Sequence, residues 1–423
     1  MLQVSFIKEN KVRVLEGLAI RNFKDVHIID ELLEVDEQRK DALKQTEQLN
    51  AESNQLAKQI GDLYKSGRRE EAEELKSRSG EIKESSKNLQ VKLSELSAQL
   101  DSLLKQIPNV PNKIVPGGKS DEDNLEIFRG GDIPELGESA LPHWELASKY
   151  NIIDFDLGSK ITGAGFPVYL GKGARLQRAL INYFLDYNTE AGFKEVLPPF
   201  MVNEASGIGT GQLPDKEGQM YHVTKDDLYL IPTAEVPVTN IYRDVIVKED
   251  ELPIKLTAYT PCFRREAGSY GAHVRGLNRL HQFDKVEIVQ VTKPEDSYST
   301  LETMVKHVEV LIQNLGLPYR ILRLCGGDLG FTSAITYDFE IYSTAQERWL
   351  EVSSISNFET YQANRLKLRY RGKDKKTQLC HTLNGSSLAL PRILAGILEN
   401  YQTDEGIQIP EVLKPYCGFE IIK

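Results

Sequence analysis

The residues best suited to chemistry begin with an arginine-rich segment in the middle of the chain. Arg264, Arg265 and Glu266 follow a strand-like run, and a polar, glycine-containing loop leads to Arg279 and to a second strand-like run with Phe283. Alternation along that second strand places an aromatic ring and charged groups on one surface. Such a surface suits a nucleotide, because a planar base can stack on the ring while guanidinium groups hold phosphate oxygens.

Two further polar clusters follow along the chain. The segment Trp349–Phe358 is expected to be a strand entering a polar turn, where Glu351 and a nearby hydroxyl offer the hard oxygen ligands that Mg²⁺ prefers. In Leu383–Ala395, a Gly-Ser turn is expected to lead into a long apolar helix that begins near Pro391. Arg392 in the first turn of that helix favours an anion, although such a turn is also common as pure architecture.

Other familiar chemical signatures are missing from the sequence. None of the three clusters matches a Walker loop, a dinucleotide-binding glycine fingerprint or a serine nucleophile elbow. The four cysteines are widely separated, with no CxxC pair and no histidine at zinc-ligand spacing. This spacing argues against a structural zinc site and against a disulfide framework.

The elements that must position these clusters belong to a domain of about 300 residues. The segment Ile107–Asn112 contains two prolines that end a helix, so a domain boundary is expected near residue 108. Beyond it, strand-like and helical stretches alternate with Gly and Pro turns, which is typical of an α+β fold. Within this domain, Gly173–Glu190 is expected to be an amphipathic helix and Glu195–Pro198 an apolar strand.

The segment Leu32–Leu104 differs in composition, because it has no proline and one aromatic residue, which favours helix. Apolar residues recur every seven positions in two series: Val35, Ala42, Leu49, Leu56 and Leu63, then Leu75, Ile82, Leu89, Leu96 and Leu103. A third series completes an a/d seam: Ala72, Ser79, Ser86, Leu93 and Leu100. Gly67 lies between the two helices and permits a left-handed turn, so the pattern predicts an antiparallel hairpin on the order of 50 Å long.

This hairpin has two interpretations. A generic coiled-coil rod for dimerisation would explain the heptads. However, Lys58, Lys65, Arg68 and Arg69 crowd the tip with Asp62 the only acid among them, although the whole chain carries a net charge of −10. A basic tip on an acidic protein favours a polyanionic partner.

Length and composition narrow the class of protein. With 423 residues, 40% hydrophobic and 27% charged, the chain is expected to be a globular protein of two or three domains. No apolar run approaches the roughly 18 residues that a bilayer span needs. Because the N-terminus also lacks a basic segment followed by an apolar one, a cytoplasmic location is expected. The negative net charge argues against coating nucleic acid by global charge and leaves room for local basic patches.

The three clusters together resemble motifs 2 and 3 of the class II aminoacyl-tRNA synthetases, in the form found in the seryl-tRNA synthetase family of bacterial type. Gly192–Pro198 is similar to motif 1, and Gly209–Pro214 and Pro232–Glu235 resemble signatures of the seryl family alone. The likeness covers nearly the whole chain, the helical hairpin included. Six motifs in order with a matching arm are a specific signal.

The resemblance implies a fold and a division of labour. Residues 1–107 would form an N-terminal tRNA-binding domain whose helical arm spans about 30–104 with its tip at about 64–69. Residues 108–423 would form the class II catalytic domain around an antiparallel sheet. At the tip, tRNA would contact Lys65, Arg68 and Arg69.

The resemblance also implies roles for individual residues. Arg264, Arg279 and Arg392 would be catalytic, with Arg264 on the α-phosphate and the serine carboxylate. The ATP site as a whole would comprise Arg264, Arg265, Glu266, Arg279, Phe283, Glu351, Val352, Ser353, Ser354 and Arg392. The serine site would comprise Thr233, Ala234, Glu235, Arg264, Glu287 and Ser386, with Glu287 contacting either the ammonium or the hydroxyl of serine. Glu351 and Ser354 would bind Mg²⁺, and no zinc is expected.

The implied activity is ATP-dependent attachment of L-serine to tRNA(Ser) through a seryl-adenylate, and to tRNA(Sec) where that tRNA exists. The implied assembly is a homodimer without membrane or DNA partners. One alternative is a non-catalytic tRNA-binding paralogue, which would lose the motif arginines or Glu351, and this chain keeps them. A ligase that loads a carrier protein would lack the arm. Arg265, His273 and Ser387 depart from the usual family pattern.

Overall fold

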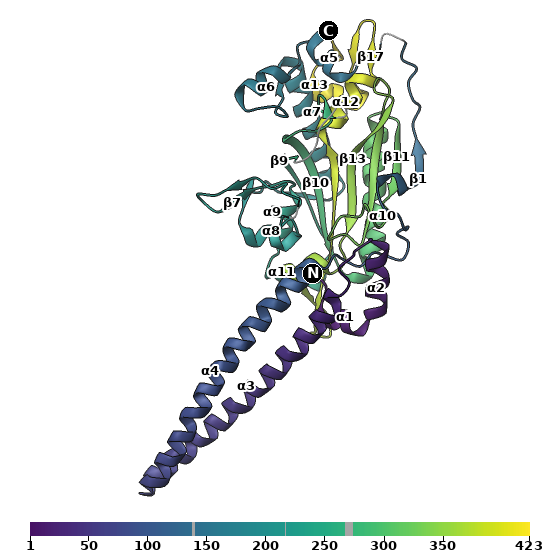
Figure 1. Ribbon diagram of the computed structural model, residues 1–423. Helices are drawn as coiled ribbons and strands as arrows, with labels where there is room; N and C mark the ends of the chain where they lie inside the picture. The colour runs from purple at the N-terminus through teal and green to yellow at the C-terminus, as the bar shows by residue number, and fades with distance from the viewer. Residues whose placement is uncertain (138–139, 216, 267–273) are drawn as a thin grey trace. The chain divides into compact units, whose positions relative to one another are not determined.

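The computed structural model describes residues 1–137, 140–215, 217–266 and 274–423, so His273 lies outside the described residues. The chain forms two compact units (Figure 1). The first, called the helical unit, comprises residues 1–19 and 23–108. The second, called the sheet unit, comprises residues 20–22 and 109–423.

The helical unit consists of four helices that include the expected hairpin. Two short helices, α1 (Val4–Glu9) and α2 (Lys11–Ile20), precede the long α3 (Ile28–Lys65) and α4 (Arg69–Gln106). Helices α3 and α4 have 38 residues each and run side by side, which confirms the predicted pair of heptad helices (Figure 1).

The seam between α3 and α4 follows the heptads. Val35, Ala42 and Leu56 are buried along α3, and the α4 positions buried in the seam include Ile82 and Leu96. The outer half of the seam also contains polar contacts: Ser86 Oγ donates a hydrogen bond of 3.1 Å to Asn50 Oδ1. The seam therefore holds less apolar surface toward the tip than toward the base.

The turn between the helices depends on Gly67. Its φ of +80° lies in the left-handed region that a residue with a Cβ adopts only at a cost. The backbone N–H of Ser66 donates to Asp62 O at 3.0 Å, and that of Arg68 donates to Leu63 O at 3.0 Å, which satisfies carbonyls at the end of α3. The chain reverses within three residues.

The sheet unit is built on a mainly antiparallel sheet, as the fold class predicts. In the described residues this sheet has eight strands in the order β1-β11-β12-β13-β16-β10-β9-β4, and only the β4–β9 pairing is parallel. Its strands are β1 (Leu125–Gly130), β4 (Lys194–Glu195), β9 (Ile254–Phe263), β10 (Gln282–Thr292), β11 (Tyr319–Arg323), β12 (Ile335–Ser343), β13 (Arg348–Asn357) and β16 (His381–Ala389).

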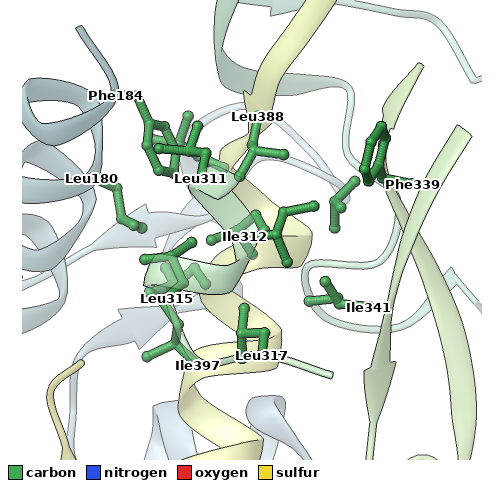
Figure 2. Packing of buried hydrophobic residues seen from close by; sticks show 14 of the residues in the cluster. Leu180, Phe184, Leu311, Ile312, Leu315, Leu317, Phe339, Ile341, Leu388 and Ile397 are labelled. Carbon is green, nitrogen blue, oxygen red and sulfur yellow. The ribbon is translucent and has the colours of Figure 1, made fainter. Parts of the chain in front are cut away.

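The core of the sheet unit forms where three helices pack on this sheet. These are α7 (Gly171–Glu190), α10 (Ser297–Asn314) and α12 (Leu390–Asn400). Figure 2 shows Leu180, Phe184, Leu311, Ile312, Phe339, Ile341, Leu388 and Ile397 in contact across these elements. Burying each such side chain contributes roughly 1.5–3 kcal/mol, so this cluster stabilises the scaffold under the polar clusters.

The remaining elements are short. The other helices of the sheet unit are α5 (His143–Lys149), α6 (Phe155–Ile161), α8 (Glu204–Thr210), α9 (Glu235–Asn240), α11 (Tyr361–Leu366) and α13 (Lys414–Cys417). The other strands are β2 (Ile153–Asp154), β3 (Val168–Tyr169), β5 (Met201–Val202), β6 (His222–Val223), β7 (Leu228–Leu230), β8 (Ile246–Lys248), β14 (Arg369–Arg371), β15 (Thr377–Leu379), β17 (Gln402–Thr403), β18 (Gly406–Gln408) and β19 (Ile421–Ile422).

Three local predictions differ from the structure. Strand β4 ends at Glu195, before the two prolines whose missing N–H groups cannot continue a ladder, so the expected strand to Pro198 is too long. The expected Gly-Ser turn at Gly385 is wrong, because this segment lies inside β16, between β13 and β10. Likewise, β13 runs to Asn357, so the polar turn expected within Trp349–Phe358 is strand for nearly its whole length. Both central strands keep their extended form because neighbouring strands on each side satisfy their backbone groups.

In the described part of the chain, no helix is both long enough and apolar enough to cross a membrane.

Candidate ATP and amino-acid site

Arg264 lies directly after β9 and beside the aromatic ring of Phe283 in β10. Its backbone N–H donates to His281 O at 2.9 Å, and its Nε donates to Pro232 O at 3.4 Å. The guanidinium carbon lies 5.3 Å from the centre of the Phe283 ring. The structure therefore combines a fixed cation and an aromatic surface at one place, which is the combination that a nucleotide requires.

Glu266 and Arg279 lie on either side of the undescribed residues 267–273. Arg279 Nε donates to Glu266 Oε2, and the two side chains form an ion pair. Glu266 has a φ of +48°, an uncommon conformation for a residue other than glycine. The N–H of Arg265 donates to Gln219 O at 2.9 Å. The family resemblance places Glu266 and Arg279 together in the ATP site, and in the structure they contact each other.

Arg392 connects the turn at Asn278 to strand β13. It lies in the first turn of α12, directly after Pro391, whose fixed φ suits that turn. Arg392 Nε donates to Asn278 O at 3.0 Å, and Nη1 donates to Glu351 O at 2.8 Å. Its Nη1 also lies 3.8 Å from Glu351 Oε2. Arg392 is therefore held between the exit of the Arg264–Arg279 segment and β13.

Glu351 is the exposed member of a group of acids on β12 and β13. Ser354 Oγ donates to Glu351 Oε1 at 3.3 Å. Across the β12–β13 pairing, Asp338 faces Ser354 and Glu340 faces Glu351. Burial raises the pKa of the Asp338 carboxyl well above its usual range, and the negative charge of Glu351 raises it further. Burial also raises the pKa of Glu340, against the lowering effect of Arg320.

This acidic group fits a Mg²⁺ ion that is shared with a substrate. Among the described residues no three His, Cys, Asp or Glu side chains are placed to hold a metal by themselves. Mg²⁺, however, usually takes one or two carboxylates and completes its shell with waters and phosphate oxygens. The half-exposed carboxylate of Glu351, next to the Ser354 hydroxyl, matches that donor set.

Two other ATP candidates on β13 are oriented inward. The Val352 side chain is 1% exposed and packs in the apolar core, so only its backbone can face a ligand. The Ser353 hydroxyl donates to Ser386 O at 2.6 Å, which ties β13 to β16. These two residues therefore support the strands that present Glu351 and Ser354.

Glu287 is the centre of a buried polar pocket. Its side chain is 1% exposed, and Lys285 Nζ lies 2.8 Å from its Oε2. Thr233 Oγ1 is 3.3 Å from the same oxygen, and Asn384 Nδ2 donates to Oε1 at 3.0 Å. Lys285 Nζ also donates to Thr233 Oγ1 at 2.8 Å. Ser386 is the register partner of Glu287 across β10 and β16, so its strand position borders the same pocket.

Glu235, the first residue of α9, supplies a second buried carboxyl. Burial raises its pKa to about 7, while a hydrogen bond from Gln362 opposes the change. Gln362 Nε2 donates to Glu235 Oε1 at 2.6 Å, and Thr382 Oγ1 donates to Gln362 Oε1 at 2.8 Å. The neighbouring Ala234 side chain packs into an apolar cluster and contributes no polar atom.

The sequence reasoning missed several members of this pocket. Lys285 had a signal, because it lies two residues before Glu287 and so shares its strand face. Asp338 and Glu340 had a similar one, since they alternate within an apolar strand. Asn384 also had one, because it lies two residues before Ser386 in β16. Gln362 had none, because it comes from α11, outside the motifs, and only the tertiary fold brings it to the pocket.

Ser387, one of the departures from the family pattern, faces away from the pocket. Its hydroxyl is buried and donates to Asn188 Oδ1 in α7 at 2.9 Å. Because adjacent strand residues point to opposite faces, Ser387 packs against the helix side while Ser386 borders Glu287.

The basic residues at the tip of the helical unit are Lys65, Arg68 and Arg69, and all three are exposed. Arg68 forms an ion pair with Glu71 in the first turn of α4. Tyr64 at the end of α3 donates to Glu73 Oε1 at 2.6 Å. The tip is therefore less positive than the sequence suggested, because acids that follow Arg69 fold back onto it.

Comparisons with known proteins agree with each other over the whole chain. Residues 1–111 match the family described as seryl-tRNA synthetase N-terminal domain, and residues 220–401 match the tRNA synthetase class II core domain (G, H, P, S and T). The chain is 48% identical to the serine–tRNA ligase of Salinibacter ruber over 421 residues, covering 99% of this chain and 98% of the relative. It is also 48% identical to that of Akkermansia muciniphila, over 100% of this chain and 99% of the relative.

Solved structures give the same result. The seryl-tRNA synthetase of Pyrococcus horikoshii complexed with ATP superimposes with a TM-score of 0.92 at 35% identity, covering 100% of this chain and 99% of that one. The cytoplasmic serine-tRNA ligase of Naegleria fowleri in complex with AMP has a TM-score of 0.88 at 30% identity, with the same coverage of 100% and 99%.

Proposed function

This chain belongs to the seryl-tRNA synthetase family, and from that premise we propose how its residues carry out the reaction. The reaction is the ATP-dependent attachment of L-serine to tRNA. It has two steps, formation of a seryl-adenylate with release of pyrophosphate and transfer of serine to the terminal ribose of tRNA. The alternative of a non-catalytic tRNA-binding paralogue has no observation in its favour, since the arginines and Glu351 are all present.

The observation that carries the proposal is the continuity of one face of β10. Phe283, Lys285 and Glu287 alternate along this strand and so share a face. At one end of that face Arg264 lies over the Phe283 ring, and at the other end Glu287 lies in a polar pocket. A nucleotide and a small polar amino acid held at the two ends would have their reacting groups near Arg264.

The arginines fit the charge problem of the first step. An anionic carboxylate must attack an anionic α-phosphate, and an in-line displacement of this kind is accelerated by fixed positive charges. We assign Arg264 to the α-phosphate and the serine carboxylate, Arg279 to the terminal phosphates, and Arg392 with Phe283 to the two faces of the adenine. When bound, Mg²⁺ would neutralise phosphate charge, and Glu351 with Ser354 would hold it.

The pocket around Glu287 fits serine rather than an apolar amino acid. Thr233, Glu235, Glu287 and Ser386 offer polar groups, and the buried Lys285 forms a 2.8 Å ion pair with Glu287. An amino acid without a hydroxyl would leave buried polar groups unpaired, a penalty worth up to roughly 10⁴-fold in discrimination. Alanine and glycine are rejected in this way, and threonine by lack of room for its methyl group.

The partners follow from the family. We propose that tRNA(Ser), and tRNA(Sec) where it exists, binds along α3 and α4, whose exposed basic tip can contact phosphates. We also propose a homodimer whose interface includes the motif 1 segment Gly192–Pro198. In this segment and just after it Leu197, Phe200 and Met201 are exposed, an apolar surface that a second copy could cover.

One experiment tests the central claim. Pyrophosphate exchange is measured with each of the twenty amino acids, and serine is expected to give the signal while alanine, glycine and threonine do not. Charging of tRNA(Ser) with radiolabelled serine tests the second step. Absence of serine-dependent exchange in the purified dimer would refute the assignment.

A further inference from the structure

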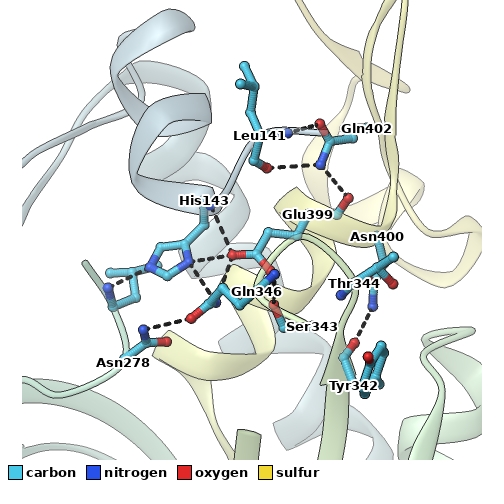
Figure 3. A network of polar contacts seen from close by, with 11 residues as sticks. Leu141, His143, Asn278, Tyr342, Ser343, Thr344, Gln346, Glu399, Asn400 and Gln402 are labelled. Atoms are coloured by element: carbon cyan, nitrogen blue, oxygen red, sulfur yellow. Dashed lines mark hydrogen bonds and ion pairs between the residues drawn. The ribbon is translucent and has the colours of Figure 1, made fainter. Parts of the chain in front are cut away.

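A buried polar network links α5 to α12 beneath the exit of the Arg264–Arg279 segment (Figure 3). His143 begins α5 and Glu399 lies near the end of α12, and both side chains are 0% exposed. His143 Nδ1 lies 2.7 Å from Glu399 Oε1, and the backbone N–H of His143 donates to the same oxygen at 2.9 Å. Ser343 and Gln346 complete the coordination of the carboxylate by donating to it.

The other nitrogen of the imidazole fixes the tautomer. The backbone N–H of Leu277 donates to His143 Nε2 at 2.8 Å. Since Nε2 accepts, it carries no proton, and Nδ1 must carry the proton that is donated to Glu399. The ring therefore holds a loop amide on one side while the carboxylate of α12 orients the ring on the other.

Two neighbouring contacts attach the same stretch of loop to α5. Gly276 has a φ of +70°, and a Cβ added there would lie 2.2 Å from His143 Nε2, so only glycine permits this close approach. The guanidinium carbon of Arg275 lies 4.9 Å from the ring centre of Trp144. Residues 275–277 thus contact α5 in three consecutive positions.

The peptide that follows connects this anchor to the proposed ATP site. Asn278 O accepts from Arg392 Nε at 3.0 Å, and Asn278 Nδ2 donates to Gln346 Oε1 at 2.9 Å. Gln346 Nε2 in turn donates to Glu399 Oε1 at 2.8 Å. Arg279 is the next residue along the chain. The positions of Arg279 and Arg392 therefore both depend on where residues 277 and 278 are held.

We propose that His143 is a positioning residue for ATP: by accepting the Leu277 amide it fixes the loop exit that sets Arg279 and Arg392. The inference rests on the proposed function of those two arginines. It explains why His143 and Glu399 form a buried pair outside the proposed substrate pockets. It also assigns a role in ATP binding to α5, which carries none of the family motifs described above.

Two substitutions of His143 distinguish its hydrogen bond to Glu399 from its hydrogen bond with the Leu277 N–H. The amide of H143Q reaches the position of Nε2, so it can accept the Leu277 N–H while losing the bond to Glu399. The amide of H143N reaches the position of Nδ1, so it can donate to Glu399 while leaving the Leu277 N–H without a partner. H143N also removes one methylene group more than H143Q, so a purely structural role predicts a greater loss of stability in H143N but equal effects on the KM for ATP and the KM for serine.

The readout is the KM for ATP and for serine in pyrophosphate exchange. For H143N we expect the KM for ATP to rise roughly tenfold, because a buried N–H loses its acceptor, with the KM for serine nearly unchanged. For H143Q we expect an ATP KM within about threefold of the wild type, since the acceptor is retained. Equal changes in the two variants, or equal changes in both Michaelis constants, would overturn the proposal.

A second readout does not depend on activity. Hydrogen exchange of the peptide that covers residues 274–280 is expected to accelerate in H143N and not in H143Q, because the Leu277 amide is released only in the former. If hydrogen exchange of this peptide is unchanged in folded H143N, the proposal is overturned. This outcome is informative even if the wild-type enzyme proves inactive with serine. If H143N does not fold, the exposed R275Q variant decides: its ATP KM should rise about two- to fivefold from loss of the contact with Trp144, and an unchanged value overturns the proposal.

Discussion

Replacement of Glu235 by glutamine is expected to change the pH dependence of stability in a defined direction. Burial raises the pKa of the Glu235 carboxyl from an ordinary value of 4.5 to about 7. Below pH 4.5 this carboxyl is protonated in the folded and unfolded states alike. Between the two pKa values the folded state binds more protons than the unfolded state, so the free energy of unfolding falls as the pH rises.

The size of the effect follows from the shift. At about 1.4 kcal/mol for each tenfold change in the protonation equilibrium, raising the pKa from 4.5 to about 7 corresponds to roughly 3 kcal/mol lost by pH 8. In E235Q the side chain stays neutral at every pH, and its Oε1 can still accept the 2.6 Å bond from Gln362 Nε2. Relative to the wild type, E235Q should therefore gain stability as the pH rises from 5 to 8.

The assay is urea unfolding of the wild type and E235Q at pH 5, 6, 7 and 8, followed by circular dichroism. The difference between the two proteins is the informative quantity, because every other titrating group cancels in it. As a control, E302Q changes an exposed carboxylate on α10 and should leave the pH dependence unaltered. Parallel stability curves for the wild type and E235Q would refute the buried, partly protonated state of Glu235.

Three further predictions concern the proposed site and the arm. R264K keeps the charge but loses the planar fork, so adenylate formation should fall by roughly 10²-fold or more; near-normal exchange would remove Arg264 from the chemistry. E351Q should raise the Mg²⁺ concentration required for half-maximal exchange, and an unchanged titration would place the ion elsewhere. Replacing Lys65, Arg68 and Arg69 by alanine should weaken tRNA charging and reduce its salt dependence, because up to about three fewer counterions are released on binding. Pyrophosphate exchange should be unaffected. Equal loss of both activities would indicate a folding defect.

The sequence predicted the features that depend on local periodicity or on motifs. The heptads determined where α3 and α4 run, and the single glycine between them determined the reversal, because both signals act over a few residues. The turn expected at Gly385 was wrong because glycine and serine are judged by local propensity, whereas β16 is central and paired on both edges.

The site was predictable to the extent that its members lie in contiguous motifs. Arg264, Phe283 and Glu287 were predicted this way, and the structure places Phe283 and Glu287 on β10 with Arg264 over the Phe283 ring. Gln362 was not, because it reaches the pocket from α11, which lies outside the motifs. His143 carried no signal either, since its partners Leu277 and Glu399 are 134 and 256 residues away.

The equal lengths of α3 and α4 have a consequence for how such an arm can change over evolutionary time. Each helix has 38 residues, and the seam repeats every seven residues on both sides. Insertion of one heptad in each helix at the same level preserves every contact of the seam and lengthens the hairpin by about 10 Å. An insertion in one helix alone leaves unmatched residues that must form a bulge. The hairpin can therefore lengthen or shorten in steps of about 10 Å without redesign of either end.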